Sequence, residues 1–519
     1  MRLVLTLAFL AAASLRGAEL VAPASTAAAP AGPLTLEKAI DRTLLHNLGL
    51  TVTRLDALRS LDSVEVSEAV FDPSFSWTNR LNGSRTLDDL TNGDPATRWH
   101  DSDVALSQKF SWGGTLSVGA GLTRTWHDSG SLASASLYDA GTNIAYTQPL
   151  LAGGWRAVNL SALISARQTA YRSRLALRAA SLDLIRDTEV AYWSLAGART
   201  LVSLRETSLR SAESLLAQIR AKRSLGDATV LEELQAEADV SSQRVAVLNS
   251  RQSLDSAEMS LRRLLGQGDA AAVEQALLVE DMPTAAVPAP QPFSPWIRTV
   301  ADFDFGTAIQ LSNIVQAEAG VAQAEQNDHP SLNLSVGGTR YGAAGAGVSG
   351  GYDNYRQQSG WNNYAELKLS FPLGFRESEA NLRSAYRARR QAELRLADVR
   401  QSLVFTARAS WRELEAARAR VDAATSSLEL QRKSYEGERA RYDAGQSDIL
   451  RVLQAQAALD SAQLNWVQAH LDARAASAKV ARLDGSILKR HGFTMDAVEQ
   501  KIGAGLGAED PLPPLTVTP

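Results

Sequence analysis

The chain of 519 residues contains no cysteine. A disulfide framework, thiolate chemistry and a lipid-modified N-terminal cysteine are therefore excluded. Basic residues do not outnumber acidic ones: the formal net charge is −4 and the isoelectric point is about 6.0. A nucleic-acid partner is not expected, because such proteins carry a basic stripe. Beyond the N-terminal region, no stretch has the roughly 18 apolar residues that a transmembrane helix needs.

The N-terminus is the one strongly apolar stretch. Met1-Arg2 precedes an apolar run from Leu3 to Ala13, which has the length of a signal-peptide core. We expect residues 1–24 to be a signal peptide and processing region, with cleavage between about Gly17 and Ala29 by the small-residue rule. The alternative is an apolar N-terminal helix. Residues 25–33 then form a Pro/Ala-rich leader outside the fold of an exported protein.

Proline is missing from a long C-terminal stretch, residues 376–484. Small or apolar residues recur there in steps of three and four, with one stutter, which is typical of a long helix packed against other helices. Residues 442–448 interrupt the pattern once. Beyond them Val452, Leu459, Trp466, Ala473 and Val480 fall seven apart. The stretch predicts a helix over 376–443, a tight turn, and a shorter antiparallel helix.

The same plan occurs earlier in the chain. Ala221–Gly226 matches Ala440–Gly445, and Leu231 matches Leu450 with the same offset along the sequence. Helices over 157–224 and to about Leu265 form the earlier hairpin, with a long arm of roughly 100 Å. We therefore divide the chain into a first repeat (34–280), a proline-rich crossing segment (281–300), a second repeat (301–490) and a C-terminal tail (491–519).

Each repeat opens with a helix and strands. A helix from Leu36 to about Val70 is expected in the first repeat, and one from Asp304 to about Gln326 in the second. Strands are expected around 75–81, 104–126, 144–150, 331–341 and 363–373, with polar loops over 86–103 and up to Asn143 and a Gly-rich loop after Tyr341. Their single apolar face fits an oligomeric membrane β-barrel. The alternative is a soluble β-domain on a coiled coil.

These features together resemble the TolC family of outer-membrane efflux channels. The resemblance is carried by Leu34–Ile40 with Asn47-Leu48, by the turn Arg441–Leu450, and by the duplication, and it covers residues 34–485. It implies an α+β membrane protein, in which duplicated long helical hairpins form a trimeric α-barrel topped by a shared transmembrane β-barrel. Its implied location is the bacterial outer membrane, extending into the periplasm.

The resemblance also implies the function. It indicates the exit duct of a tripartite efflux or type I secretion system, not an enzyme, with no catalytic residue, cofactor or metal. The implied partners are two further copies of the chain, a periplasmic adaptor, an inner-membrane pump of RND or ABC type, and outer-membrane lipid, with no nucleic acid. The alternatives are an envelope-spanning coiled-coil tether, which would need neither amphipathic strands nor two equal hairpins, and a periplasmic adaptor, which would carry one hairpin.

The first repeat departs from the family pattern in length. The segment from Pro73 to Pro149 is nearly twice as long as the corresponding segment from Pro330 to Pro372. With Gly113-Gly114 as a turn, the extra residues predict a second hairpin, hence four strands from repeat one and two from repeat two. The trimer would then hold 18 strands instead of the family's 12. The alternative is a bulge with a long external loop.

The candidate functional residues lie at the hairpin turns. The resemblance implies adaptor docking at the helical tips, and the two turns supply Leu225, Gly226, Asp227, Thr229, Ala444, Gly445, Ser447 and Asp448. It pairs Glu232 with Tyr442, and we expect a hydrogen bond between them that holds the tips closed. Where relatives carry two carboxylates at the pore entrance, this sequence has Arg451 and Gln454, so an acidic ring is not expected.

One four-residue pattern occurs twice in the first repeat. Trp99-His100-Asp101-Ser102 and Trp126-His127-Asp128-Ser129 are near-copies in the expected external loops. They could bind a metal or a partner, but Trp at a strand end is typical of an interface aromatic, and Asp-Ser of a turn.

Overall fold

The structure is a computed structural model of the whole chain, and it describes residues 34–85, 87, 90, 96–127, 136–268, 276–282, 287–342 and 345–504. The expected signal peptide and leader (residues 1–33) and the end of the tail (residues 505–519) lie outside the described residues. The chain divides into two compact units. One comprises the residues up to Asn47, with Asp187–Val287 and Ala417–Ala475; the other comprises Leu48–Arg186, Pro288–Ala416 and the residues from Ala476 onward.

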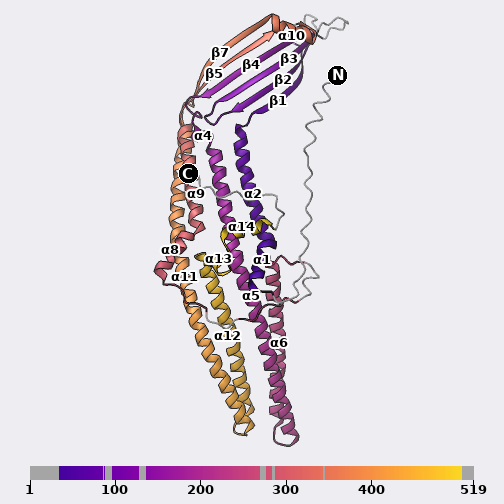
Figure 1. Ribbon diagram of the computed structural model, residues 1–519, viewed down its shortest axis with the longest axis vertical. Coiled ribbons are helices and arrows are strands. Elements are labelled where there is room, and N and C mark those ends of the chain that lie inside the picture. The colour runs from indigo at the N-terminus through magenta and orange to yellow at the C-terminus, as the bar shows by residue number, and fades with distance from the viewer. Residues whose placement is uncertain are drawn as a thin grey trace. The chain divides into compact units, whose positions relative to one another are not determined.

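The first unit is helical. It contains α1 (Leu36–His46), the C-terminal part of α5 (Ser161–Ser224), α6 (Val230–Leu264), and parts of α11 (Arg376–Asp443) and α12 (Ile449–Leu483). In Figure 1, α5 with α6 and α11 with α12 each form an antiparallel hairpin that ends in a turn. A buried cluster around Leu34, Tyr192 and Leu261 packs the base of the first hairpin, where the Tyr192 hydroxyl donates to the Leu34 carbonyl at 2.7 Å.

The second unit holds one antiparallel sheet in the order β1-β2-β3-β4-β5-β7 (Figure 1). The strands are β1 (Ser74–Ser84), β2 (Thr97–Lys109), β3 (Thr115–His127), β4 (Leu137–Pro149), β5 (Ser331–Gly342) and β7 (Ser359–Ser370), and a two-residue strand β6 (Gly345–Ala346) pairs with β4. The four strands before residue 150 are 11, 13, 13 and 13 residues long. The prediction of an additional hairpin in the first repeat is therefore confirmed, and the bulge alternative is wrong.

Helices complete the second unit. They are α2 (Leu48–Glu68), a 3₁₀ turn η1 (Ala69–Phe71), α4 (Arg156–Asn159), α8 (Phe293–Phe303), α9 (Phe305–Asn327), α10 (Gly347–Gln357), α13 (Ser486–Arg490) and α14 (Met495–Ala504), with the remaining parts of α5, α11 and α12. Figure 1 shows α2, α4 and α9 at one end of the sheet and α10 at the other. Among the described helices, none combines the length and apolar character needed to cross a bilayer.

The two faces of the sheet differ in polarity, because successive side chains of a strand point to opposite faces. The register puts Phe75, Leu106, Val118 and Ile144 in one row across four strands. We call this side the apolar face; its exposed large side chains are Phe75, Trp77, Leu81, Val104, Leu106, Val118, Ile144, Val336, Trp361, Leu367 and Leu369. The other side, the polar face, carries Ser76, Thr78, Arg80, Asp101, Asp103, Asn143, Glu366 and Lys368. Such alternation is typical of a transmembrane barrel strand.

Several predicted helix bounds differ from the structure. The long helix of the second repeat spans 376–443, as predicted. The single helix expected from Leu36 to Val70 is wrong, because Asn47 adopts an extended conformation between α1 and α2 and donates its side-chain N–H to the Leu264 carbonyl. The helix expected from residue 157 is interrupted at Leu160, between α4 and α5.

Other corrections concern segments interpreted as loops. The strands β2 and β4 begin at Thr97 and Leu137, inside the expected polar loops, since their polar residues are paired in the sheet. The Gly-rich loop after Tyr341 is largely the helix α10. Part of the crossing segment is α8, in whose first turn Pro295 needs no helical N–H partner. The tail contributes α14.

Candidate functional site

The two hairpin turns share one backbone conformation. In the first, the Asp227 N–H donates to the Lys222 carbonyl at 2.9 Å, and in the second the Gln446 N–H donates to the Arg441 carbonyl at 2.8 Å. Each hydrogen bond closes over one glycine, Gly226 in the first turn and Gly445 in the second, and these glycines have φ of +86° and +72°. This is the Schellman helix end, which favours glycine because other residues are strained at positive φ. The turns are thus built by backbone chemistry and leave their side chains free for other roles.

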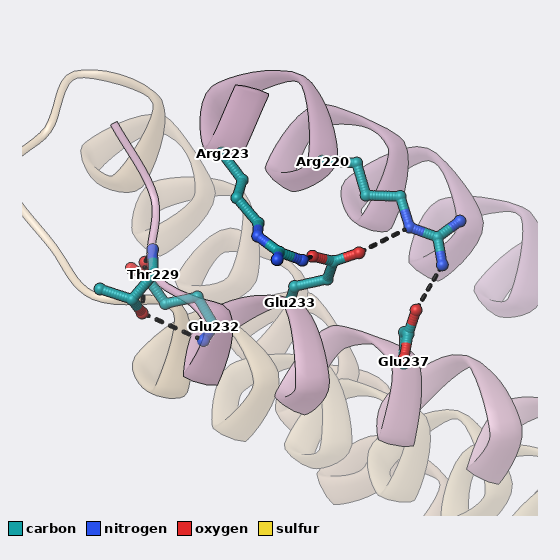
Figure 2. A network of polar contacts seen from close by, with 6 residues as sticks. All are labelled: Arg220, Arg223, Thr229, Glu232, Glu233 and Glu237. Atoms are coloured by element: carbon teal, nitrogen blue, oxygen red, sulfur yellow. Dashed lines mark hydrogen bonds and ion pairs between the residues drawn. The ribbon is translucent and has the colours of Figure 1, made fainter. Parts of the chain in front are cut away.

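The return helices begin with matching caps. The Thr229 side chain accepts from the Glu232 N–H, and the Glu232 carboxylate accepts from the Thr229 N–H at 2.6 Å, a complete capping box (Figure 2). In the second turn the Asp448 carboxylate accepts from the Arg451 N–H at 2.9 Å. Thr229 and Asp448 therefore occupy equivalent positions and fix where α6 and α12 start.

The first tip also carries a cluster of charges, which we call the tip ion cluster: Arg220, Arg223, Glu233 and Glu237. Figure 2 shows Glu233 between the two arginines, with Glu237 bound to Arg220. Hydrogen bonding from Arg223 lowers the pKa of Glu233; burial opposes this shift, and hydrogen bonding from Arg220 adds to it. The cluster links α5 to α6 close to the end of the hairpin.

Tyr442 is buried at the tips and packs with Ile219, Ile449 and Val452. The Lys222 Nζ lies 4.3 Å from the centre of its ring, a cation–π distance. Burial raises the pKa of Tyr442, and the negative charges of Glu232 and Asp443 raise it further. Among the contacts of the described residues, the carboxylate of Glu232 bonds Thr229 and not the Tyr442 hydroxyl. The gating role of this pair stays a prediction.

The remaining predicted residues are mostly accessible. Leu225, Gly226, Asp227, Ala444, Gly445 and Asp448 are exposed and Ser447 is half-buried, donating to Glu438 at 2.9 Å. Leu225 exposes 78% of its surface, and Val230, Leu231 and Leu234 next to it are also exposed, so the first tip presents an apolar patch. Arg451 and Gln454 are exposed on α12.

A buried polar contact between the hairpins was not anticipated. The carboxylate of Asp460 on α12 accepts from Ser208 on α5 at 2.8 Å and from Gln243 on α6 at 2.8 Å. It also accepts from Gln456 at 3.0 Å and lies 3.5 Å from an Arg205 nitrogen. We call these five residues the Asp460 network; all of them except Arg205 are buried.

The network places the negative charge of Asp460 in a buried setting, and this charge contributes to a raised pKa of Asp239 on α6. Burial raises the pKa of Asp239, a hydrogen bond with Gln243 opposes this, and the charge of Asp460 raises the pKa further. The sequence offered one signal: Gln456 and Asp460 are polar residues set close to the seam positions Val452 and Leu459. A polar side chain on a packed helix face needs a partner, but the partners on α5 and α6 belong to the other repeat.

The first Trp-His-Asp-Ser copy does not lie in an external loop, contrary to the expectation from sequence. Trp99–Ser102 lies within β2, and Trp126-His127 ends β3, while Asp128 and Ser129 lie outside the described residues. His100 contacts the Asn79 side chain on the apolar face, whereas Asp101 accepts from Thr123 on the polar face. In the part of the chain that the structure describes, no three potential metal ligands converge.

The chain combines an antiparallel sheet with two long helical hairpins. The chain belongs to the outer membrane efflux protein family, whose model matches residues 102–267 and 310–486, about two thirds of the chain. A comparison with curated proteins finds no match.

Solved channels share this fold. The Campylobacter jejuni CmeC outer membrane channel has a TM-score of 0.65 at 16% identity, with 91% of this chain and 89% of that chain covered. The open state of the Neisseria gonorrhoeae MtrE outer membrane channel has a TM-score of 0.63 at 17% identity, with coverage of 87% and 88%. A membrane protein from Pseudomonas aeruginosa has a TM-score of 0.64 at 20% identity, with coverage of 86% and 90%.

Family membership establishes the general function. The chain is an outer-membrane exit channel of an efflux system, located in the outer membrane and extending into the periplasm. Members of the family are channel proteins that work as homotrimers with an adaptor and an inner-membrane pump.

Proposed function

We propose that three copies of this chain close an 18-stranded barrel that conducts solutes without catalysing a reaction. The supporting observation is the six-stranded sheet, whose outer strands β1 and β7 each have one edge unpaired within the described chain. Unpaired backbone groups are costly in lipid, so β1 of one copy pairs with β7 of the next.

The absence of cysteine makes this pairing directly testable. Thr78→Cys in β1 is combined in turn with Tyr364→Cys, Glu366→Cys or Lys368→Cys in β7, all on the polar face. At least one combination is expected to cross-link into a ladder that ends at the trimer, while each single variant stays uncross-linked. A ladder that ends at another size would refute the 18-stranded barrel.

We further propose that the tips dock a periplasmic adaptor. The patch at Leu225, the two glycine turns and the capping residues Thr229 and Asp448 form an accessible surface at the end of each hairpin. Leu225→Asp is expected to abolish adaptor copurification and dye efflux, because a charge replaces the most exposed apolar side chain of the patch. Ser256→Asp, an exposed position far along α6, adds the same charge and serves as the control. Equal loss in both variants would argue against docking at the tips.

The adaptor in turn connects the channel to an inner-membrane pump of the RND or ABC class, and the pump that copurifies decides between them. We also propose that Arg451 and Gln454 line the entrance and that, in the closed trimer, Glu232 turns from Thr229 to accept from the Tyr442 hydroxyl and holds the tips closed. Purified trimers reconstituted in planar bilayers are expected to conduct ions, more often in Tyr442→Phe than in the wild type. A protein without conductance under any condition would be a tether instead of a channel.

A further inference from the structure

Two aromatic rows bound the apolar face of the sheet. Toward the helices, the Trp112 Nε1 donates to the Tyr146 hydroxyl at 3.1 Å. At the opposite end, Tyr138 pairs with Arg124, and Trp126 lies on the same face of β3 as Arg124. Eight residues of β4 separate Tyr138 from Tyr146, about 26 Å along the strand. At the usual strand tilt of about 35–45°, this length corresponds to roughly 20 Å across the membrane, which is close to the roughly 25 Å apolar band between the aromatic girdles of outer-membrane barrels. The Tyr138 row therefore lies at the outer lipid headgroups.

The helix α10 lies on this apolar face at its outer end. The Tyr355 hydroxyl is 2.8 Å from the Thr142 Oγ1, which belongs to that face. A Cβ on Gly351 would stand 2.6 Å from the Tyr138 carbonyl oxygen, and one on Gly342 would stand 2.4 Å from the Tyr355 nitrogen. These glycines let the helix lie directly on the strands. On the same helix, the side chains of Val348 and Tyr352 are more than half exposed.

Two arginines stand at this outer rim, on the lipid side. The Arg124 guanidinium lies 5.0 Å from the centre of the Trp126 ring and 5.7 Å from that of Tyr138, and it donates to Ser136. The Arg340 guanidinium lies 4.9 Å from the centre of the Tyr355 ring and donates to Ser359 at 2.9 Å. Within the described residues, neither arginine forms an ion pair with a carboxylate. Aromatic stacking holds each guanidinium flat while leaving N–H groups for a further acceptor.

A cation on the lipid-facing side is costly at the midplane and tolerated at the interface. Guanidinium groups bind phosphate oxygens in a bidentate manner. We propose that Arg124 and Arg340 form a rim site for a phosphorylated glycolipid of the outer leaflet, with the aromatic shelves of Tyr138 and Tyr355 against its sugar and acyl boundary. The arginines are two strands and four residues apart in register, about 16 Å, so a lipid with two phosphates can contact both.

The test counts retained lipid on the intact trimer. The full-length protein, purified in neutral detergent, is incubated with mixed micelles of that detergent and phosphatidylcholine that contain either diphosphoryl lipid A or phosphatidylglycerol, and is then washed. Lipid A per trimer is then counted by native mass spectrometry, which also reports the trimer mass. We expect Arg124→Gln and Arg340→Gln each to lower retained lipid A by about tenfold, following the loss of one charge-assisted phosphate contact worth roughly one decade. Arg340→Lys should keep part of the binding.

The control is Arg80→Gln, which removes a positive charge from the polar face of β1. Its neighbour Leu81 pairs with His100, which pairs with Arg124, so Arg80 lies one residue along the strand from the row of Arg124. It should retain lipid A like the wild type. Equal retention by the trimeric double variant Arg124→Gln/Arg340→Gln and the wild type would overturn the rim site. Retention of phosphatidylglycerol as strong as that of lipid A would overturn the assignment of a glycolipid.

Discussion

Replacing Asp460 by alanine is expected to free α12 from α5 and α6. The carboxylate is the acceptor shared by the Ser208, Gln243 and Gln456 side chains, and it is the counter-ion of Arg205. Alanine removes both oxygens, and the donors around it stay buried. A motion that separates α12 from the first hairpin must break these contacts of Asp460. Because Asp460→Ala has already lost them, the free-energy cost of that motion is lower in the variant than in the wild type.

The magnitude follows from burial. Removing one partner of a buried ion pair costs about 3–5 kcal/mol, and each buried donor left unsatisfied costs about 1–3 kcal/mol. The Arg205 side chain is 17% exposed and its nitrogen lies 3.5 Å from Asp460, so water recovers part of that loss. We therefore expect about 3 kcal/mol, which changes an equilibrium between closed and open tips by roughly two orders of magnitude.

The assay is single-channel recording of purified trimers in planar bilayers, paired with thermal unfolding in detergent. Asp460→Ala should raise the open probability strongly, and Asp460→Asn, which keeps one acceptor oxygen, should raise it less. The control is Asp472→Ala, because the recorded contact of Asp472 is with Gln468 on its own helix. If Asp460→Ala and Asp472→Ala gave the same open probability and the same melting temperature, the Asp460 network would not hold the hairpins together.

Three further predictions concern other parts of the chain. Burial opposes ionisation of Glu499, but hydrogen bonds and charge from two arginines of α5 outweigh burial and lower the pKa of Glu499. The ionised carboxylate therefore stabilises α14 above the ordinary pKa of 4.5, and this stabilisation is lost as the pH falls toward the lower pKa of the folded state. Limited proteolysis of α14 should accelerate in that acid range, and in Glu499→Gln it should be fast at every pH. Gly445→Ala should destabilise the hairpin by about 1 kcal/mol, because Gly445 has φ of +72°. Gly437→Ala, inside α11 with open space around the added Cβ, should instead stabilise the hairpin by about 0.5–1 kcal/mol. A melting-temperature shift of the same sign in both variants would contradict these two expectations. Ile144→Lys, on the apolar face, should lower the free energy of folding into lipid vesicles by about 2–4 kcal/mol, while Asn143→Lys, on the polar face, should fold nearly as well as the wild type. Equal folding yields of the two variants would contradict the assignment of the apolar face to lipid.

The parts of the fold that sequence reasoning located well are governed by local chemistry. The helix over 376–443 has both bounds as predicted, because it holds no proline and is followed by a turn in which Gly445 adopts positive φ. The additional hairpin was predicted from the turn at Gly113-Gly114, and Gly113 indeed has φ +91°. In such segments the residues that decide the structure are neighbours in sequence, so a linear pattern contains the information.

The errors have a common physical origin in tertiary contacts. Thr97–Asp103 looks like a loop because it is polar, yet each residue is paired with β1 and β3, and the polar side chains alternate with those of the apolar face. The helix α10 contains three glycines, which disfavour a helix in isolation. Here Gly351 permits the close approach to Tyr138 that stabilises α10 on the sheet. Neither circumstance is visible without the neighbouring strands.

The two tips show where duplication ends and specialisation begins. Their turns use the same backbone hydrogen bonds and equivalent caps, Thr229 and Asp448, so the duplicated sequence predicts both. The charges differ: the first tip is braced by the tip ion cluster, while in the second Glu438 accepts from Ser447. A heptad seam says only that a position faces another helix, and not which one. The Asp460 network draws on three helices, so its partners became visible only when the hairpins were folded, although the polar residue in an apolar seam already required one.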